Sequence, residues 1–511
     1  MPLLAASVLA CALCLLHALP AAAEDSVTAR SSFPKGGPRM VRIEIAPDGW
    51  TFREAESHRP FVPYGCNYTP AWSGWAPDYF GDGYWDAAKV DRDFGTLAGL
   101  GANVVKLVLS YRRILPDPQA PGQVTPDPRV LRRFDETLDL AGRHGLRVIA
   151  TLEQSWHGAP AWFHREGSWY GPGTHAILAR FWRDFAARYR DDGRIFAFSF
   201  CVETHLDGWG SPPCLAAWRA WARKRYRSLA RANSAWGQHF ATWDSVAAPG
   251  QDGYNAANWR ERPEGTPENE NQTNDPFLYD FQLFRERTAF EWMASQSRAV
   301  KTGDPGRLTS MGFVQWQPLL RELWSSNEGP GYGPEYNARE LARAVDFLGI
   351  HFYPVYPNGD DETQLKYLEL WARWAYAGKP VVLEEFNREP APLNAPWCER
   401  VIRRSQGFVS GWLVWTLQDV PNSDGITKVC GLLDARGRPT DWGKRFAEMA
   451  PEVKAWRLQR QKSLRTVKAD KRWLYTSGSY RGFLEGLLAA PSARVSYTME
   501  SQRGPRPLQR R

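Results

Sequence analysis

Two adjacent acids, Glu384 and Glu385, are the residues whose types and position best suit chemistry. They follow Val381-Val-Leu383, a short apolar run of the kind that forms a strand buried on both faces. An acid at the carboxyl end of a buried parallel strand lies where α/β folds place their catalytic groups. Because successive strand residues point to opposite faces, we expect only one of the two carboxylates to face a given pocket. The alternative is a solvated charge pair that caps the strand.

Other polar and aromatic side chains follow further apolar runs, and they would converge if the strands are parallel. In chain order they are Asn67, Lys106, Glu153 with Trp156 and His157, Glu203, His351 with Tyr353, Glu385, and Trp415 with Gln418. Cleavage of a glycosidic bond needs one carboxylic acid that protonates the leaving oxygen and a second carboxylate that attacks or activates water. We predict that Glu203 and Glu385 fill these roles, facing each other at the ~5–5.5 Å of a retaining enzyme. The predicted substrate-binding residues are His351, Tyr353, Trp415, Lys106, Asn67, Trp156 and His157.

Each of these residues also has a structural interpretation. Glu203 could form a salt bridge with a nearby Arg, and Lys106 could point outward. Ordinary core packing beneath the strand ends could explain His351, Tyr353 and Trp415. Asn67 also begins an Asn-Tyr-Thr glycosylation sequon, and Asn271 begins a second one.

Eight apolar strand-like runs alternate with helix-like segments. The predicted strands are 61–65, 103–109, 146–152, 195–200, 308–313, 345–350, 381–383 and 408–415, and the predicted helices are 85–100, 128–144, 174–190, 214–232, 276–302, 362–376 and 441–449. Such alternation is typical of parallel βα units, and eight of them close a (β/α)8 TIM barrel. An open doubly wound sheet is the alternative, but no GxGxxG motif follows the first strand. Residues 233–275 form a long insertion after strand four, which we expect to shape the cleft.

The two ends of the chain differ from its middle. Residues 3–23 are almost wholly apolar and end in Ala-Ala-Ala, which predicts a secretory signal peptide over 1–23 and a secreted or periplasmic protein, with an uncleaved membrane anchor as the alternative. A linker over 24–39 and a catalytic domain over 40–450 follow. The net charge is +8, and residues 454–511 carry 14 Lys/Arg against 3 Asp/Glu, so the rest of the chain is slightly acidic. We therefore predict a basic, partly disordered extension over 451–511, which could also touch nucleic acid, anionic lipid or an acidic polysaccharide.

Five cysteines remain once the signal peptide is removed, and an odd number leaves at least one thiol unpaired. They are Cys66, Cys201, Cys214, Cys398 and Cys430, with Cys201–Cys214 and Cys398–Cys430 as open disulfide alternatives. No CxxC, HxH or HExxH motif occurs after residue 23, so we predict neither a metal site built by the protein nor a cofactor. The expected partner is a carbohydrate substrate, with no nucleic acid and no stable membrane insertion. The sequence does not predict an oligomeric state.

Several segments resemble the clan of retaining (β/α)8 glycoside hydrolases. Residues 379–386 (KPVVLEEF) resemble the nucleophile strand of family 5 cellulases and mannanases, residues 346–354 (DFLGIHFYP) resemble the clan's sixth strand, and residues 411–415 (GWLVW) resemble its eighth. Residues 218–240 (WRAWARKRYRSLARANSAWGQHF) resemble the stretch after the acid/base in family 42 β-galactosidases. The resemblance implies Glu385 as the nucleophile and Glu203 as the acid/base, without a cofactor. It also implies that His351 and Tyr353 line the substrate subsite and that Trp415 forms its floor.

Two positions depart from the clan's pattern. The clan usually has Asn before the acid/base, where this chain has Val202, and an Arg near the nucleophile, where it offers Lys106. Losing the Asn removes a hydrogen bond that strengthens in the transition state. A catalytically weak or inactive carbohydrate-binding barrel and a transglycosylase with the same Glu pair are therefore the competing hypotheses. The family 5 segment suggests a β-glucan or β-mannan substrate, and the family 42 segment suggests a β-galactoside.

Overall fold

The computed structural model describes residues 39–73, 79–117, 120–121, 124–153, 158–203, 206, 208, 210–248, 276–314, 338–354, 361–388, 391–423, 425–461, 465–469 and 495–499. The predicted signal peptide and most of the predicted linker lie outside these residues. So do residues 249–275 of the predicted insertion.

Eight parallel strands close a barrel, which confirms the predicted fold and excludes the open sheet. In order around the barrel they are β4 (Tyr64–Asn67), β5 (Val104–Ser110), β6 (Arg147–Glu153), β7 (Ile195–Val202), β8 (Leu308–Phe313), β9 (Leu348–Phe352), β10 (Val381–Phe386) and β11 (Trp412–Val414). The last strand pairs with the first, Trp412 opposite Tyr64. All eight strands therefore end at the same mouth.

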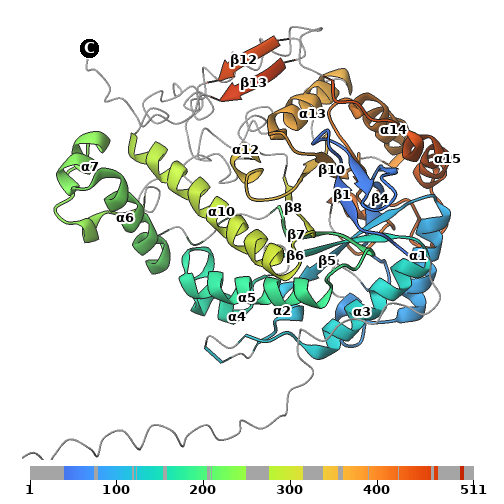
Figure 1. The fold of residues 1–511 in the computed structure, drawn as a ribbon, viewed down its shortest axis with the longest axis horizontal. Helices are drawn as coiled ribbons and strands as arrows, with labels where there is room; N and C mark the ends of the chain where they lie inside the picture. Colours follow the sequence, from blue (N-terminus) through green and yellow to red (C-terminus); the bar gives the residue numbers. More distant parts are fainter. Residues whose placement is uncertain are drawn as a thin grey trace, which may run out of the picture.

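Helices surround the barrel (Figure 1). The longer ones are α1 (Ala87–Gly99), α3 (Pro128–Arg143), α5 (Pro172–Arg188), α10 (Pro276–Gly303), α13 (Asp361–Ala375), α14 (Asn394–Ser405) and α15 (Asp441–Ala455), and the short ones are α2 (Tyr111–Ile114), α4 (Ala161–Arg165) and α12 (Ala338–Leu341). In α3, Asp127 accepts a hydrogen bond from the Arg129 backbone N–H, and Pro128 occupies the first turn, which favours a helix start there. The buried stripe of that helix is Val130, Leu131, Phe134, Leu138 and Ala141.

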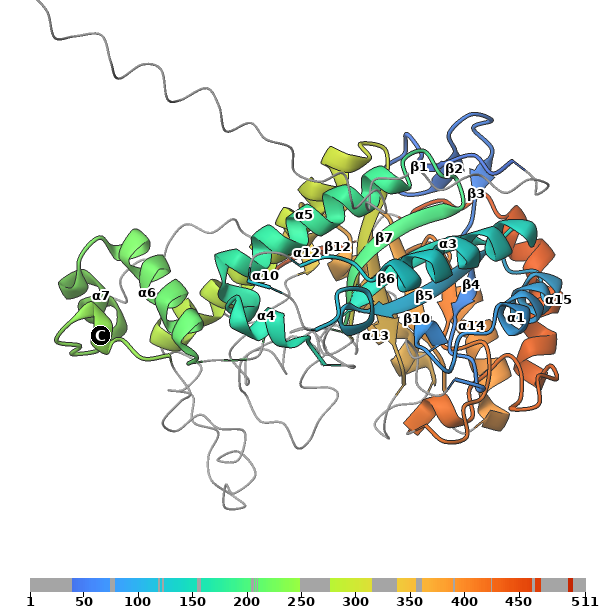
Figure 2. The ribbon, with the colours of Figure 1, turned by 90° about the horizontal axis from the view of Figure 1, so that it is seen from below.

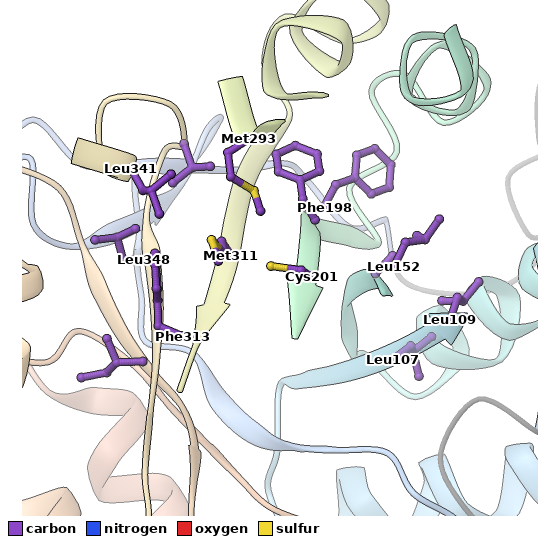
Figure 3. Packing of buried hydrophobic residues seen from close by; sticks show 14 of the residues in the cluster. Leu107, Leu109, Leu152, Phe198, Cys201, Met293, Met311, Phe313, Leu341 and Leu348 are labelled. Carbon is purple, nitrogen blue, oxygen red and sulfur yellow. The ribbon is translucent and has the colours of Figure 1, made fainter. Parts of the chain in front are cut away.

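The outward faces of the strands pack against this helical layer. Figure 3 shows Phe198 and Cys201 of β7 and Met311 of β8 with Met293 of α10 beside them, and Leu341 of α12 near Leu348 of β9. All of these side chains are buried. This packing fixes each strand end, and hence each side chain at the mouth.

A small antiparallel sheet, which the sequence analysis did not identify, covers the opposite end of the barrel. It consists of β1 (Ile43–Ile45), β2 (Phe52–Glu54) and β3 (Pro60–Phe61). Its apolar side chains cluster with residues at the amino ends of the barrel strands: Ile43, Phe52 and Phe61 with Val104, Ile149, Phe196, Leu308, Phe347, Val382 and Leu413. The Pro-Asp-Gly turn before Trp50, in which Gly49 has φ +67°, was an available signal for this hairpin.

The helix predicted over 214–232 is instead two helices. α6 (Pro212–Tyr226) and α7 (Leu229–Trp236) are separated at Arg227, whose φ is +69°, and Ser228 caps α7. Together they project from the barrel beside the first turns of α10 (Figures 1 and 2). No glycine or proline marks the break in residues 214–232, so the sequence gives no sign of the positive φ at Arg227.

The predicted domain boundary at residue 450 falls inside α15, which runs to Ala455. Beyond it, the backbone N–H of Gln461 donates to Gly407 O over 2.8 Å, and Arg373 donates to Gln461 O over 2.9 Å. The packed unit therefore extends at least to Gln461. Two further segments, β12 (Arg465–Ala469) and β13 (Val495–Met499), pair in parallel.

The five cysteines are buried thiols, and none of the proposed disulfides is formed. In the described part of the chain, no helix has both the length and the apolar composition that crossing a membrane requires.

Candidate active site

Four barrel strands bring charged side chains together at the mouth. Glu203 follows β7, and His351 lies on β9. His351 Nδ1 is 2.7 Å from Glu203 Oε1 and 3.3 Å from Glu385 Oε2 on β10. Lys106 of β5 donates a hydrogen bond to Glu385 Oε1 over 2.9 Å, and the hydroxyl of Tyr353 donates to Glu385 Oε2, also over 2.9 Å. Each carboxylate oxygen of Glu385 therefore accepts a hydrogen bond from a side chain.

The two predicted catalytic carboxylates face each other. One oxygen of Glu203, one oxygen of Glu385 and a ring nitrogen of His351 all lie within 4.8 Å of one another. The side chain of Glu385 is 5% exposed and that of Glu203 is 14% exposed, so Glu203 is the more open of the two. A pair at this separation suits an attacking carboxylate and a proton donor on the same bond.

Glu385 is the acid of the pair Glu384–Glu385 that lies at the mouth, and Glu384 is completely buried behind it, yet both contact Lys106. The register between β9 and β10 shifts after Leu383, so that Glu385 pairs with His351 and Glu384 is an extra residue on its strand. Such a bulge breaks the alternation of side chains. As a result, Lys106 Nζ lies 3.5 Å from Glu384 Oε2 as well as 2.9 Å from Glu385 Oε1.

These buried charges shift one another. Burial disfavours the imidazolium of His351, but Glu385, Glu203 and Glu384 raise its pKa to about 9. Burial likewise opposes the charge of Lys106, yet Glu384 and Glu385 raise the pKa of its ammonium. Burial would raise the pKa of Glu384, but Lys106 and His351 hold that pKa below its ordinary value. The site is a compact network of opposite charges.

Glu203 itself has an unusual backbone. Its φ is +46°, and its N–H donates to Gly312 O on β8 over 3.1 Å. Non-glycine residues rarely adopt positive φ, and they do so disproportionately at functional sites. The preceding Val202 packs against Val108 of β5, so an apolar pair stands where the clan usually has its Asn.

Trp415 and Asn67 lie at neighbouring strand ends. Trp415 is 6% exposed, and its indole N–H donates to Thr427 Oγ1 over 2.9 Å. Asn67 is fully buried, and its amide donates to Glu384 O over 2.9 Å and to Val414 O over 3.2 Å. Asn67 thus fastens β4 to β10 and β11, and its role as a substrate-binding residue stays a prediction.

Some of the remaining predicted site residues are outside the part of the chain that the structure describes. Trp156 and His157 lie outside them, as does the side chain of Glu153. Gln418 binds backbone groups, donating to Asp434 O and Ala435 O.

Two residues of the site were not identified from the sequence as functional. Glu384 was visible as one of a pair, and Asn387, whose amide donates to Trp415 O and Cys430 O, stands two residues after Glu385.

Glu203, His351 and Glu385 are also the one group in the described part of the chain with three donor atoms close enough to hold a metal ion. However, His351 Nδ1 is within hydrogen-bond distance of Glu203 Oε1, and a protonated imidazole has no lone pair for a metal. The cluster therefore suits a hydrogen-bonded acid pair better than a metal centre.

A (β/α)8 barrel with paired carboxylates at its mouth defines the class of the protein, and comparison with known proteins agrees. The model of the cellulases of glycosyl hydrolase family 5 matches residues 65–255, and the β-galactosidase model of glycosyl hydrolase family 42 matches residues 173–416. The two matches together span residues 65–416, and they confirm the resemblance to the clan of (β/α)8 glycoside hydrolases.

Individual relatives are distant. A protein of Oryza sativa subsp. japonica, provisionally described as mannan endo-1,4-beta-mannosidase 9, is 28% identical over 134 residues, which is 22% of this chain and 32% of the relative. The match thus spans about a third of that relative's length.

Solved structures are similar over most of the chain. An exo-β-1,4-mannosidase from Opitutaceae bacterium strain TAV5 has TM-score 0.60 at 18% identity, covering 91% of this chain and 74% of that one. A family 5 protein from Streptomyces cattleya in complex with Manβ1-4GlcNAc has TM-score 0.58 at 18% identity, covering 86% and 94%. A β-galactosidase from Rahnella sp. R3 has TM-score 0.63 at 15% identity, covering 86% and 65%. At these identities the likeness shows the fold.

Proposed function

We propose that the protein is an exported, retaining glycoside hydrolase that cleaves a β-glycosidic bond with Glu385 as nucleophile and Glu203 as acid/base. The observation that carries this proposal is the separation of the two carboxylates, whose nearest oxygens lie within 4.8 Å. Retaining enzymes have carboxyl groups ~5–5.5 Å apart, whereas inverting ones leave ~6.5–9.5 Å for a water molecule. The short separation supports double displacement.

In the first step, Glu385 attacks the anomeric carbon and the bond from that carbon to the leaving oxygen breaks. Glu203 transfers its proton to that oxygen, so the leaving group departs as an alcohol. In the second step, Glu203 accepts a proton from water, whose oxygen attacks the anomeric carbon, and Glu385 leaves as a carboxylate. The Lys106 ammonium and the Tyr353 hydroxyl, both 2.9 Å from Glu385 oxygens, stabilise that departing carboxylate.

For the substrate we propose a β-mannoside or a β-galactoside. Support comes from the mannosidases and β-galactosidases among the similar proteins. Trp415 beside the carboxylates offers an indole on which a sugar ring can stack. The Val108–Val202 pair at the mouth offers no hydrogen bond to the sugar, so its hydroxyl groups must be bound by other residues.

We propose export because residues 3–23 are almost wholly apolar and end in small residues. Secreted and whole-cell fractions of the native host, probed with an antibody to the barrel, test this part separately.

The experiment that tests the activity is hydrolysis of aryl β-glycosides (mannoside, galactoside, glucoside, xyloside and fucoside) by the wild type, Glu385→Gln and Glu203→Gln. We expect release from one sugar, with the anomeric configuration retained in the first product seen by NMR, and at least a 1,000-fold loss in both variants. Glu452→Gln makes the same chemical change on the surface of α15, where the side chain is 50% exposed, and should keep full activity. Activity that survives in Glu385→Gln, or an inverted product, would overturn the proposal.

A further inference from the structure

A third carboxylate, Glu384, lies behind the two catalytic ones. It is completely buried, and the bulge in β10 turns it toward the same cations that contact Glu385. Nothing in the mechanism above uses it. A buried carboxylate without a function is costly, because burial alone favours its neutral form.

Two glycines make the space that Glu384 occupies. A Cβ on Gly349 of β9 would lie 2.0 Å from Glu384 Oε2, and a Cβ on Gly312 of β8 would lie 2.9 Å from the same oxygen and 2.8 Å from His351 Nε2. Neither glycine has the positive φ that would require glycine for backbone reasons. Their lack of a side chain is needed to admit the carboxylate and the imidazole together.

The contacts of Glu384 are with cations. Its Oε2 lies 3.5 Å from Lys106 Nζ and 3.7 Å from His351 Nε2, and among the described residues neither of its oxygens accepts a hydrogen bond. These two cations then reach forward to the catalytic acids, Lys106 to Glu385 and His351 to both Glu203 and Glu385. Both cations therefore contact Glu384 as well as the catalytic acids in front of them.

We infer that Glu384 is a positioning residue: as the shared counter-ion of Lys106 and His351, it sets the protonation of the two catalytic carboxylates. This inference rests on the proposed function. Glu384 touches neither the substrate nor the reacting atoms, and it acts through the two cations.

A count of charges shows the consequence. The groups that face this cluster are Lys106 on β5, Glu203 after β7, His351 and Tyr353 around β9, and Glu384 and Glu385 on β10. With Lys106 and His351 charged, the cluster is neutral when Glu384 and Glu385 are ionised and Glu203 holds a proton. That is the state from which the reaction must start.

Removing the charge of Glu384 changes which state is neutral. In Glu384→Gln, two cations face two carboxylates, so neutrality requires Glu203 to be ionised and the acid loses its proton more readily. Loss of a negative neighbour lowers the pKa of every nearby group. Both limbs of the pH profile of kcat/KM should therefore move to lower pH.

The test compares pH profiles of wild type, Glu384→Gln and Glu384→Asp on the substrate found above. We expect Glu384→Gln to move the alkaline limb down by at least one pH unit, and Glu384→Asp, which keeps the charge, to keep the wild-type limbs at a lower rate. Asp304→Asn is the matched control, since Asp304 is a buried acid paired with Arg307 before β8, at the other end of the barrel. It should lose stability without moving the limbs. A Glu384→Gln profile that is lower in amplitude but unmoved would overturn the inference.

A second readout needs no activity. The imidazole 15N signals of His351, assigned by their loss in His351→Asn, report its titration in the wild type and in Glu384→Gln. We expect the midpoint to fall by at least one pH unit in Glu384→Gln. An unchanged midpoint would overturn the inference whatever the kinetics show, whereas a shifted midpoint in a protein that cleaves no glycoside would overturn the proposed function alone.

Discussion

The Lys106 ammonium lies 2.9 Å from Glu385 Oε1 and 3.5 Å from Glu384 Oε2, and all three side chains are buried. One compact cation therefore serves two adjacent acids. Lys106 Nζ reaches the two carboxylates as a single point charge, whereas an Arg would present a planar pair of donors to one of them. This geometry gives a reason for Lys at a position where the clan usually has Arg.

Lys106→Met should therefore affect both stability and activity. It leaves two buried carboxylates with His351 as their remaining cation, and losing one partner of a buried ion pair costs about 3–5 kcal/mol. We expect the free energy of unfolding in urea to fall by that amount, and kcat/KM to fall by about 100-fold.

Lys301→Met is the control for Lys106→Met. Its ion pair with Asp346 involves a side chain that is 34% exposed, and removing it should cost less than about 1 kcal/mol. If Lys106→Met were as stable as the wild type, the two acids could not both be ionised in the folded protein.

Tyr353→Phe should act on the nucleophile rather than on binding. It removes the hydrogen bond to Glu385 Oε2, and a hydrogen bond to a charged group is worth about 1.5–3 kcal/mol. We expect kcat to fall by roughly 10- to 100-fold with KM little changed. Tyr367→Phe removes a hydroxyl from a buried tyrosine on α13, away from the site, and should stay within about twofold of the wild type. A change confined to KM would instead assign the Tyr353 hydroxyl to the sugar.

Gly349→Ala should test whether Glu384 needs the space that the missing side chain of Gly349 leaves. The new Cβ would meet Glu384 Oε2 at 2.0 Å and Met311 O at 3.1 Å, and overpacking of this kind costs about 1–3 kcal/mol. We expect a loss of that size in urea unfolding and a partial rescue when Glu384→Ala is added, because the clash is then gone. Gly99→Ala at the end of α1, where a Cβ meets nothing within 4 Å, should be neutral or stabilising. Additive losses in the double variant would mean that the backbone of β9, not the carboxylate, opposes the methyl group.

The sequence predicted the order of strands and helices because local signals mark each of them: apolar runs, and caps such as Asp127-Pro128. It also predicted that Glu203, His351, Tyr353 and Glu385 would meet, since parallel strands end at one mouth. It did not predict that Glu384 and Glu385 would share Lys106, because the bulge that allows this depends on how β10 pairs with β9, about 30 residues earlier in the chain. The break at Arg227 was missed because no glycine or proline marks it, although its φ is positive.

From the raised pKa of His351 we predict how the free energy of unfolding depends on pH. Its folded pKa of about 9 is raised above the ordinary value near 6.5, so the folded protein holds this proton more tightly than the unfolded chain. The stabilisation is therefore fully present below about pH 6.5 and is lost as the pH rises through 9, up to about 3 kcal/mol in all. Urea unfolding at pH 6, 7.5 and 9 should show this decline. His351→Asn should remove it. His175→Asn should retain it, because burial lowers the pKa of His175 and its titration falls below this range. A parallel decline in the wild type and in His351→Asn would show that the carboxylates at the mouth do not hold this proton.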